Sequence, residues 1–114
     1  MFGKLHRFHG HGSVRAVYGR GQTVRGGQLS LRYASRPEGK PYRVAVVVSR
    51  KVHKSAVTRN RIRRRVYEAV RTGAVRPPAA TELVFTVFSE QLADMSTEQL
   101  QKLIDSLLQK VTAA

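Results

Sequence analysis

The spacing of apolar side chains along the chain predicts three strands, within residues 28–33, 42–49 and 82–88. The first segment alternates between apolar and polar residues, which is typical of a strand with one buried face. The second contains an unbroken apolar run from Val44 to Val48, and such a run favours a central strand that is covered on both faces. In the first and third segments, one face carries Leu29, Leu31, Tyr33, Leu83, Phe85 and Val87. The opposite face carries Ser30, Arg32, Val84 and Phe88.

A period of about 3.6 residues predicts helices in three other segments. Ser13 can cap a short helix that reaches residue 18, and Ser55 can cap a second helix that continues to about residue 71. A capping box at residues 96–99 begins a third helix. The apolar stripes of the second and third helices consist of Ile62, Val66, Ala69, Val70, Leu100, Leu103, Ile104, Leu107, Leu108 and Val111. The order helix, strand, strand, helix, strand, helix predicts an α+β fold, a single-domain α-β sandwich with a mixed sheet.

The length of 114 residues fits one domain that spans the whole chain. Residues 1–12 are rich in glycine and histidine, and we expect them to be flexible. The absence of cysteine excludes disulfides and cysteine-ligated zinc sites. No apolar run approaches the roughly 20 residues that span a bilayer, and the first residues lack the apolar core of a signal peptide. We therefore expect a cytoplasmic protein.

Positive charge is concentrated in the first two thirds of the chain. The formal net charge is +14, and residues 1–76 hold 19 Lys and Arg against two acids, whereas residues 77–114 hold two lysines against five acids. Such a field repels itself, and its natural counterpart is a polyanion that releases counterions on binding. A membrane surface also attracts cations, but the basic helix lacks the Trp, Phe and Leu face of an interfacial anchor. Nucleic acid is therefore the favoured partner.

Eight cations and no acid lie between residues 50 and 65. On the predicted helix, four polar residues project away from the apolar stripe and two lie nearer to its edge. These are, respectively, Asn60, Arg61, Arg64 and Arg71, and then Arg59 and Arg63. A solvated helix face is the simplest alternative, but such a face usually interleaves both signs of charge, because like charges destabilise a helix. The guanidinium fork also suits bidentate contacts with phosphate, so the pattern favours nucleic-acid binding.

The same segment resembles the signature of the ribonuclease P protein family. Residues 48–52, Val-Ser-Arg-Lys-Val, are similar to the family's Ser-Lys-Lys strand end, and residues 56–64, Ala-Val-Thr-Arg-Asn-Arg-Ile-Arg-Arg, to its Ala-Val-x-Arg-Asn-Arg-x-Lys-Arg helix. Further similarities lie at Arg7-Phe8, Val17-Tyr18, Gly21, Arg43-Val44 and Glu82-Leu83-Val84. The chain departs from the family at Val14, at residues 53–55 and at Tyr67, where the family has an aromatic residue, a glycine turn and an arginine. The family's first-strand tyrosine falls at or beside Arg32.

The resemblance implies an α-β sandwich in which the arginine helix lies in a left-handed β-α-β crossover. It implies that this helix and the preceding loop contact a catalytic RNA through Arg50, Lys51, Lys54, Arg59, Asn60, Arg61, Arg63 and Arg64. It also implies that a cleft between the sheet and the helices binds the single-stranded 5′ leader of precursor tRNA. Candidate stacking residues for this cleft are Tyr18, Tyr33 and Phe8, for which the alternative is ordinary core packing.

The basic part of the chain lacks a constellation for phosphodiester hydrolysis by protein side chains. Such hydrolysis usually needs paired carboxylates that hold Mg²⁺, or a histidine pair, whereas Glu38 and Glu68 are isolated. A Gly-rich segment holds His6, His9 and His11 without a fourth metal ligand nearby. The resemblance implies a subunit of an endoribonuclease that binds no cofactor by itself, and it implies no protein partner. In that family picture the RNA holds the Mg²⁺ and carries the chemistry, while the protein lowers the Mg²⁺ requirement.

Two other classes of nucleic-acid-binding protein are alternatives. A structural ribosomal protein, which binds RNA without any role in catalysis, has a similar size and charge and is the alternative. A helix-turn-helix DNA-binding protein is disfavoured, because the arginine helix is flanked by predicted strands and not by a second helix across a short turn.

Overall fold

The computed structural model describes residues 21–36 and 38–113. Its elements are β1 (Gln22–Arg25), β2 (Leu29–Ser35), β3 (Arg43–Val47), α2 (Ala56–Thr72), β4 (Thr81–Val87), the 3-10 helix η2 (Glu90–Ala93) and α3 (Thr97–Ala113). All three predicted strands and the two later helices are present. The short helix predicted at residues 13–18 and the expected flexibility of residues 1–12 lie outside the described residues.

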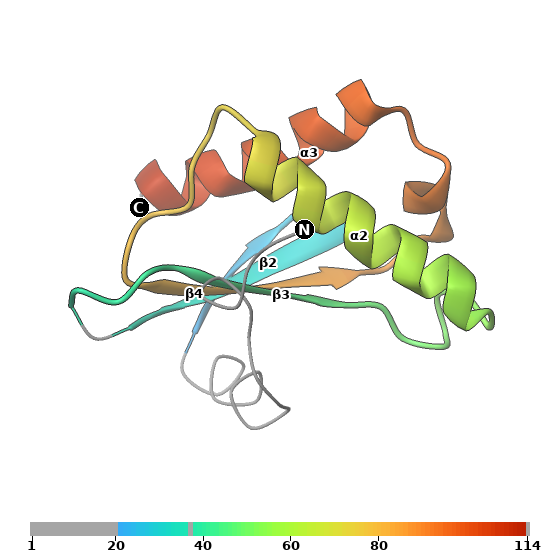
Figure 1. Ribbon diagram of the computed structural model, residues 1–114, viewed down its shortest axis with the longest axis horizontal. Helices are drawn as coiled ribbons and strands as arrows, with labels where there is room; N and C mark the ends of the chain where they lie inside the picture. The colour runs from blue at the N-terminus through green and yellow to red at the C-terminus, as the bar shows by residue number, and fades with distance from the viewer. Residues whose placement is uncertain (1–20, 37, 114) are drawn as a thin grey trace.

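The four described strands form one mixed sheet in the order β1-β2-β4-β3. The β1–β2 and β2–β4 pairs are antiparallel, whereas β3 and β4 are parallel, with Val46 opposite Phe85. A parallel pair needs a crossover connection, and α2 provides it. Both α2 and α3 cover the same face of the sheet (Figure 1). The α+β sandwich and its β-α-β crossover are therefore confirmed, whereas the left-handedness of the crossover stays a prediction.

The prediction that the apolar run at residues 44–48 forms a central strand is wrong. Among the described strands β3 lies at the edge beside β4, and β4 is the strand with neighbours on both sides. Val44 and Val46 belong to the main core, whereas Ala45 packs with Ala34 and Val84 in a small cluster on the other face. An apolar run therefore indicates that both faces of a strand are buried, but it does not indicate whether the strand pairs with one neighbouring strand or with two.

The main core lies between the sheet and the two helices. The apolar stripe predicted for α2 is buried as expected, because Ile62, Val66, Ala69 and Val70 all lie in this core, and Tyr67 joins them. The side chains that α3 contributes are Leu100, Ile104, Leu107, Leu108 and Val111. Each large apolar side chain that is fully buried stabilises the fold by about 1.5–3 kcal/mol. The stripe thus fixes how α2 sits on the sheet and leaves its polar side outward.

Side chains and close packing define the helix ends. Ser55 caps the N-terminus of α2, where its Oγ accepts a hydrogen bond from the main-chain N–H of Thr58 at 3.4 Å. Ser96 caps α3 in the same way and accepts from the main-chain N–H of Gln99 at 3.1 Å. At the other end of α2, a Cβ at Gly73 would lie 2.5 Å from Nε2 of Gln101. That Nε2 donates to the carbonyl of Ala69 at 2.8 Å. The absence of a side chain at residue 73 therefore lets α3 approach the last turn of α2.

Two short elements, β1 and η2, were not predicted from the sequence. Val24 is the only large apolar side chain in β1, so the strand gives almost no periodic signal, and it forms because β2 pairs with it. With only four residues, η2 is too short for a helical period to be visible. Nevertheless, η2 packs against α2, and it places acidic residues beside the basic helix.

Candidate nucleic-acid interface

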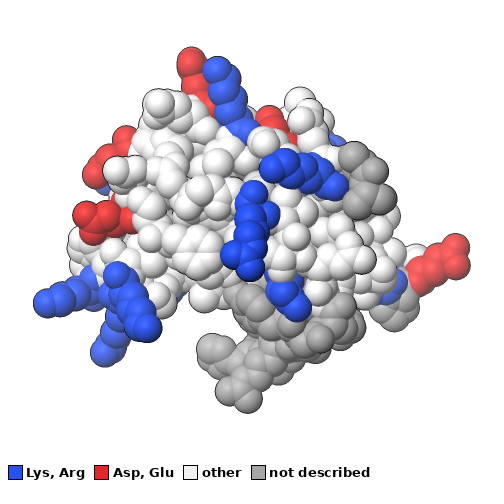
Figure 2. Space-filling model, turned by 180° about the vertical axis from the view of Figure 1, so that it is seen from behind, with Lys and Arg blue, Asp and Glu red and all other residues white. Residues whose placement is uncertain are grey.

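Charged side chains are distributed unevenly over the surface. Figure 2 shows a group of Lys and Arg side chains at the lower left, with acidic side chains directly above it and further basic side chains down the middle of the same face. Because 19 of the 21 Lys and Arg belong to residues 1–76, the basic surface is formed mainly by the sheet, the loops and α2. A field of this kind concentrates anionic partners at the basic end.

The outward side of α2 carries the polar row that the sequence predicted. Asn60, Arg61 and Arg64 are exposed because they lie opposite the buried stripe, and Arg59 and Arg63 are half-buried at its edge. All five of these predicted site residues are therefore on accessible parts of one helix. Phosphate groups of a nucleic acid can reach the guanidinium groups without disturbing the core.

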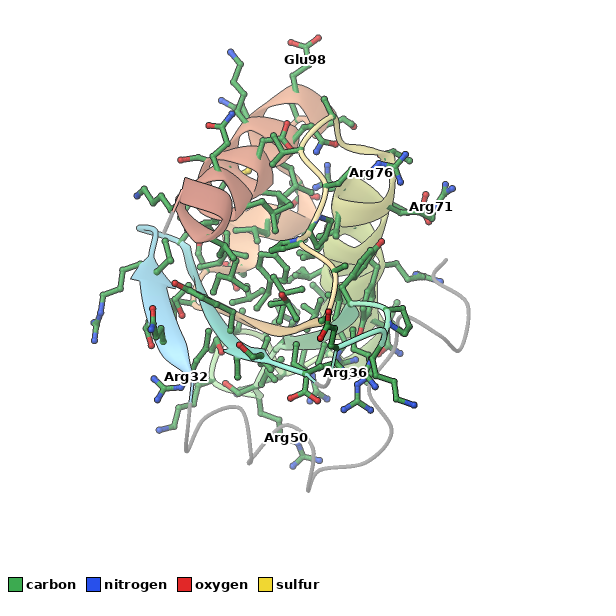
Figure 3. All side chains as sticks on the ribbon, turned by 90° about the vertical axis from the view of Figure 1, so that its left-hand side faces the viewer. Arg32, Arg36, Arg50, Arg71, Arg76 and Glu98 are labelled. Carbon is green, nitrogen blue, oxygen red and sulfur yellow. The ribbon has the colours of Figure 1, made fainter. Side chains whose placement is uncertain are left out.

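The loop between β3 and α2 adds cations at the helix N-terminus. Arg50, Lys51 and Lys54 are all exposed, and Figure 3 shows Arg50 below the sheet, on the side away from the helices. The first turn of α2 contains no acid. Since the N-terminus of a helix is the positive end of its dipole, these three cations and the helix favour the same anionic ligand.

Local hydrogen bonds order the beginning of this surface. The main-chain N–H of Ser55 donates to Nδ1 of His53 at 3.0 Å, so the imidazole closes the turn in front of α2. The guanidinium of Arg59 donates through Nε to the carbonyl of Ser55 at 3.5 Å. Arg63 donates to the side-chain oxygen of Asn60. Such bonds restrict the rotamers of long side chains, so less conformational entropy is lost when an anionic ligand binds.

One arginine of the basic run has a different environment. Arg65 is half-buried and donates to the main-chain carbonyls of Leu92 and Met95. Its guanidinium thereby ties α2 to η2 and to the segment before α3. The sequence-based site omitted Arg65 but counted it in the basic run, and the structure gives it a contact within the fold.

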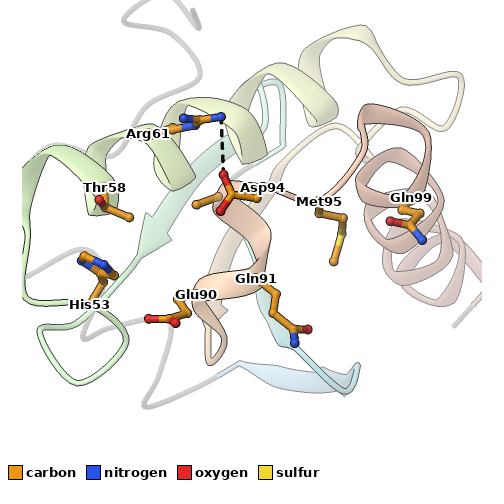
Figure 4. A pocket seen from close by; sticks show the side chains of 9 residues that line it. His53, Thr58, Arg61, Glu90, Gln91, Asp94, Met95 and Gln99 are labelled. Atoms are coloured by element: carbon orange, nitrogen blue, oxygen red, sulfur yellow. Dashed lines mark ion pairs between the residues drawn. The ribbon is translucent and has the colours of Figure 1, made fainter.

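Acidic side chains lie next to the basic outward side of α2. The carboxylate of Asp94 lies 3.8 Å from the guanidinium of Arg61. Both side chains are exposed to solvent, that of Asp94 by 87% and that of Arg61 by 58%. Both residues line a cavity of about 480 Å³ between the start of α2 and η2 (Figure 4). The other residues that line it are His53, Thr58, Glu90, Gln91, Ala93, Met95 and Gln99. Sequence reasoning missed Asp94, because only the tertiary structure brings it to α2.

Arg71, at the far end of α2, has an acidic partner on its own helix. Its Nη2 lies 2.6 Å from Oε2 of Glu68, and this hydrogen bond holds the pKa of the Glu68 carboxyl well below its ordinary value. The two charges largely cancel as seen by a distant phosphate. Arg71 therefore adds little net charge to the outward side of α2.

Of the three aromatic residues predicted for the leader cleft, only Tyr33 lies in the part of the chain that the structure describes. Tyr33 is half-buried against the main core, and its hydroxyl donates to Oε1 of Gln22 at 2.8 Å. It therefore lies on the helix-covered face, whereas Arg32 lies on the opposite face (Figure 3). Tyr18 and Phe8 lie outside the described residues.

The described residues contain no cluster of three or more His, Asp or Glu side chains that could hold a metal ion. The most buried acid, Glu82, is 5% exposed and forms ion pairs with Arg43 and, at 3.7 Å, with Arg36. This carboxylate is therefore engaged within the fold. In the described range, no helix is both long enough and apolar enough to cross a membrane.

Comparison with known proteins identifies related sequences along nearly the whole chain. The family described as ribonuclease P matches residues 2–112. A ribonuclease P protein component from Synechococcus sp. (strain JA-2-3B'a(2-13)) is 34% identical over 108 residues, which cover 92% of this chain and 80% of that protein. A second, from Chloroflexus aurantiacus (strain ATCC 29366 / DSM 635 / J-10-fl), is 46% identical over 68 residues, or 60% of this chain and 50% of that protein.

Solved structures share the fold. The RNase P protein of Staphylococcus aureus matches with a TM-score of 0.78 at 23% identity, covering 93% of this chain and 94% of that one. The RNase P protein of Thermotoga maritima matches with a TM-score of 0.75 at 19% identity, covering 85% and 89%. At these identities the structures establish the common fold, while the family match and the sequence relatives establish membership. The chain belongs to the ribonuclease P protein family.

Proposed function

We propose that this chain is the RNA-binding protein subunit of ribonuclease P and that it assists a catalytic RNA in removing the 5′ leader from precursor tRNA. The observation that carries the proposal is the row of accessible cations from Arg50 to Arg64, at the positions of the family signature. The same family match favours this function over that of a structural ribosomal protein. We expect the protein to act in the cytoplasm.

The basic row would dock the protein on the catalytic RNA. The residues assigned to this contact are Arg50, Lys51, Lys54, Arg59, Asn60, Arg61, Arg63 and Arg64. Their charges would neutralise phosphates that otherwise need divalent cations, so less Mg²⁺ would suffice for the RNA to fold and act. In this division of labour the RNA holds the catalytic Mg²⁺, and the protein contributes binding and orientation of the substrate.

The second task of the protein would be to hold the leader. Unpaired nucleotides are bound by cations together with aromatic surfaces on which bases stack. Tyr18 and Phe8 remain candidates for this role, and so does the accessible part of Tyr33. Contact with the leader would let the holoenzyme prefer precursor tRNA to mature tRNA, which carries no leader.

Reconstitution tests the proposal. The full-length protein is added to ribonuclease P RNA of the same organism with precursor tRNA at low Mg²⁺, and cleavage is followed over time. We expect the protein to lower the Mg²⁺ concentration for half-maximal cleavage and to tighten binding of precursor over mature tRNA. The protein alone, after nuclease treatment, should cleave nothing. Robust cleavage by RNA-free protein, or a Mg²⁺ requirement that the protein leaves unchanged, would reject the proposed function.

A further inference from the structure

The two long sides of α2 differ in what lies beside them. Arg65 donates to the main-chain carbonyls of Leu92 and Met95 and therefore faces η2. At about 100° per residue, Arg63 lies roughly 160° around the helix axis from Arg65. Arg59 lies one turn before Arg63, on the same side. One side of the basic helix therefore faces η2, and the other faces away from it.

The helix α3 lies on the side of α2 that faces η2. Both α3 and η2 contact α2, and α3 also contacts β1 and β2, whereas α2 contacts β3 (Figure 1). Among the described strands β3 is at the edge of the sheet. The side with Arg59 and Arg63 therefore lies above this edge, and the loop with Arg50 and Lys51 follows β3 there. We call the two sides of α2 the η2 side and the β3 side.

Two carboxylates lie on the η2 side, next to the cations. Asp94 directly follows η2 and is 3.8 Å from Arg61. Glu90, the first residue of η2, lines a cavity together with Arg50 and Lys51 of the loop. Both acids are exposed, and both line the cavity of about 480 Å³ between the start of α2 and η2 (Figure 4). A negative group therefore stands beside each end of this part of the basic surface.

The backbone that carries these carboxylates is held at several points. Leu92 is fully buried in the main core. The Oγ of Ser89 accepts from the main-chain N–H of Gln91 at 3.2 Å, and Nε2 of Gln28 donates to Oε1 of Gln91 at 2.5 Å. The main-chain N–H of Asp94 donates to the carbonyl of Gln91 at 3.1 Å. An RNA strand that approaches from the η2 side therefore meets negative charge that the backbone cannot move aside.

We propose that Glu90 and Asp94 form an electrostatic boundary, which keeps RNA off the η2 side of α2 and directs it to the outward and β3 sides. A phosphate that approaches across the cavity is repelled by both carboxylates, and it has to displace Asp94 before it can pair with Arg61. An exposed ion pair changes affinity by about 1.4- to 5-fold, so two carboxylates favour one side over the other by roughly 2- to 25-fold. The inference rests on the proposed function, in which α2 binds RNA.

Photo-crosslinking from single cysteines shows which side of α2 the RNA occupies. The chain contains no cysteine, so Val57→Cys and Gln99→Cys each provide one attachment point for an azidophenacyl group. Val57 is 76% exposed and lies two turns before Arg64 on the outward side. Gln99 is exposed and lines the cavity beside η2. With the full-length protein bound to ribonuclease P RNA, we expect most crosslinks from residue 57 and few from residue 99.

Neutral substitution of both acids should open the η2 side to RNA. In the double variant Glu90→Gln with Asp94→Asn, crosslinking from residue 99 relative to residue 57 should rise by about threefold or more, because the repulsion is removed. The control Glu38→Gln with Asp105→Asn removes the same charge from residues that do not line this cavity. It should leave the ratio unchanged, and circular dichroism checks that every variant is folded.

A double-mutant cycle tests the pair of Asp94 and Arg61 by affinity. In the wild-type protein a phosphate must replace Asp94 at Arg61, so part of the gain from the new contact is lost. Arg61→Gln should therefore weaken RNA binding more in the Asp94→Asn background than in the wild-type background, by about 1.4- to 5-fold. Arg64→Gln, on the outward side, should weaken binding equally in both backgrounds.

The outcomes separate this inference from the proposed function. Equal crosslinking from residues 57 and 99 in the wild-type background would overturn the boundary, and so would an unchanged ratio after both acids are neutralised. The same rise in the control variant would overturn it too, because net charge would then explain the effect. Crosslinks are counted on RNA that is already bound. The result therefore stands even if the protein fails to lower the Mg²⁺ requirement, and that failure would reject the proposed function alone.

Discussion

Arg64 and Arg65 are neighbours in the sequence, but their guanidinium groups have different environments. Arg64 is exposed on the outward row of α2, whereas Arg65 donates to the carbonyls of Leu92 and Met95 and joins α2 to η2. Two neighbouring arginines of equal charge therefore differ: one guanidinium is exposed, and the proposed function assigns it to RNA, whereas the other holds two parts of the fold together. The number of arginines in the run overstates the number of phosphates that it can neutralise.

This pair gives the first prediction. Arg65→Gln should lower the free energy of unfolding by about 1–3 kcal/mol, because two carbonyls lose a charged hydrogen-bond donor. Arg64→Gln is the matched control and should leave the thermal melt nearly unchanged while weakening RNA binding. Thermal melts beside RNA-binding curves measure both. Equal melting temperatures for the two variants would contradict the assigned role of Arg65.

Removing charge from the outward row should act on RNA binding and not on folding. The double variant Arg61→Ala with Arg64→Ala should weaken binding to ribonuclease P RNA by a few kcal/mol. The slope of log affinity against log salt should become shallower by roughly one unit, or slightly less, for each lost phosphate contact. Circular dichroism controls for folding. An unchanged affinity and slope in a folded variant would show that these side chains do not face the RNA.

The carboxylate of Asp94 should oppose RNA binding. It lies 3.8 Å from Arg61 and is largely exposed, so an approaching phosphate must compete with it. Asp94→Asn should therefore tighten RNA binding by about 0.2–1 kcal/mol, the range for exposed ion pairs, and more at low salt. Glu98→Gln removes an exposed acid from the start of α3 (Figure 3) and serves as the control. If both variants bind alike, a general change of net charge explains the effect and the specific pair does not.

Glu82 should matter for stability and not for RNA binding at the outward row. Its buried carboxylate lies between Arg36 and Arg43, and removal of one member of such a group leaves charge without compensation. We expect Glu82→Gln to destabilise the fold by about 3 kcal/mol. Urea denaturation measures the change, and binding to ribonuclease P RNA is assayed below the transition. A denaturation midpoint equal to that of wild type would refute the structural role of this carboxylate.

The outward-facing residues of α2 could be predicted from the sequence because they depend only on the period of the helix. A helix of known period with Ile62 and Val66 inward must present Asn60 and Arg64 outward, and the structure confirms this arrangement. The neighbours of a strand are not a local property, and for that reason the apolar run of β3 was placed wrongly. Both β1 and η2 depend on pairing or packing with distant segments.

The contacts that cross between elements could not be predicted either. Asp94 reaches Arg61, and Leu92 reaches Arg65, only because η2 folds back against α2. Phe88 was placed by its alternation on the face opposite the core, and its side chain is exposed in the structure. The sequence did not show that Phe88 and Arg25 would line one cavity. Periodicity thus predicts which face a residue occupies, whereas the residue across from it requires the tertiary structure.

The central position of β4 in the sheet affects how the protein folds while the ribosome synthesises it. Of the described strands, β1 and β2 form one hairpin, and β3 pairs only with β4, which is made last. While the ribosome synthesises residues 1–80, the sheet cannot close, and β3 has no strand to pair with. All but two of the 21 Lys and Arg have then already been synthesised. The nascent chain is thus an incompletely folded polycation beside ribosomal RNA until its seven-residue strand β4 has been made.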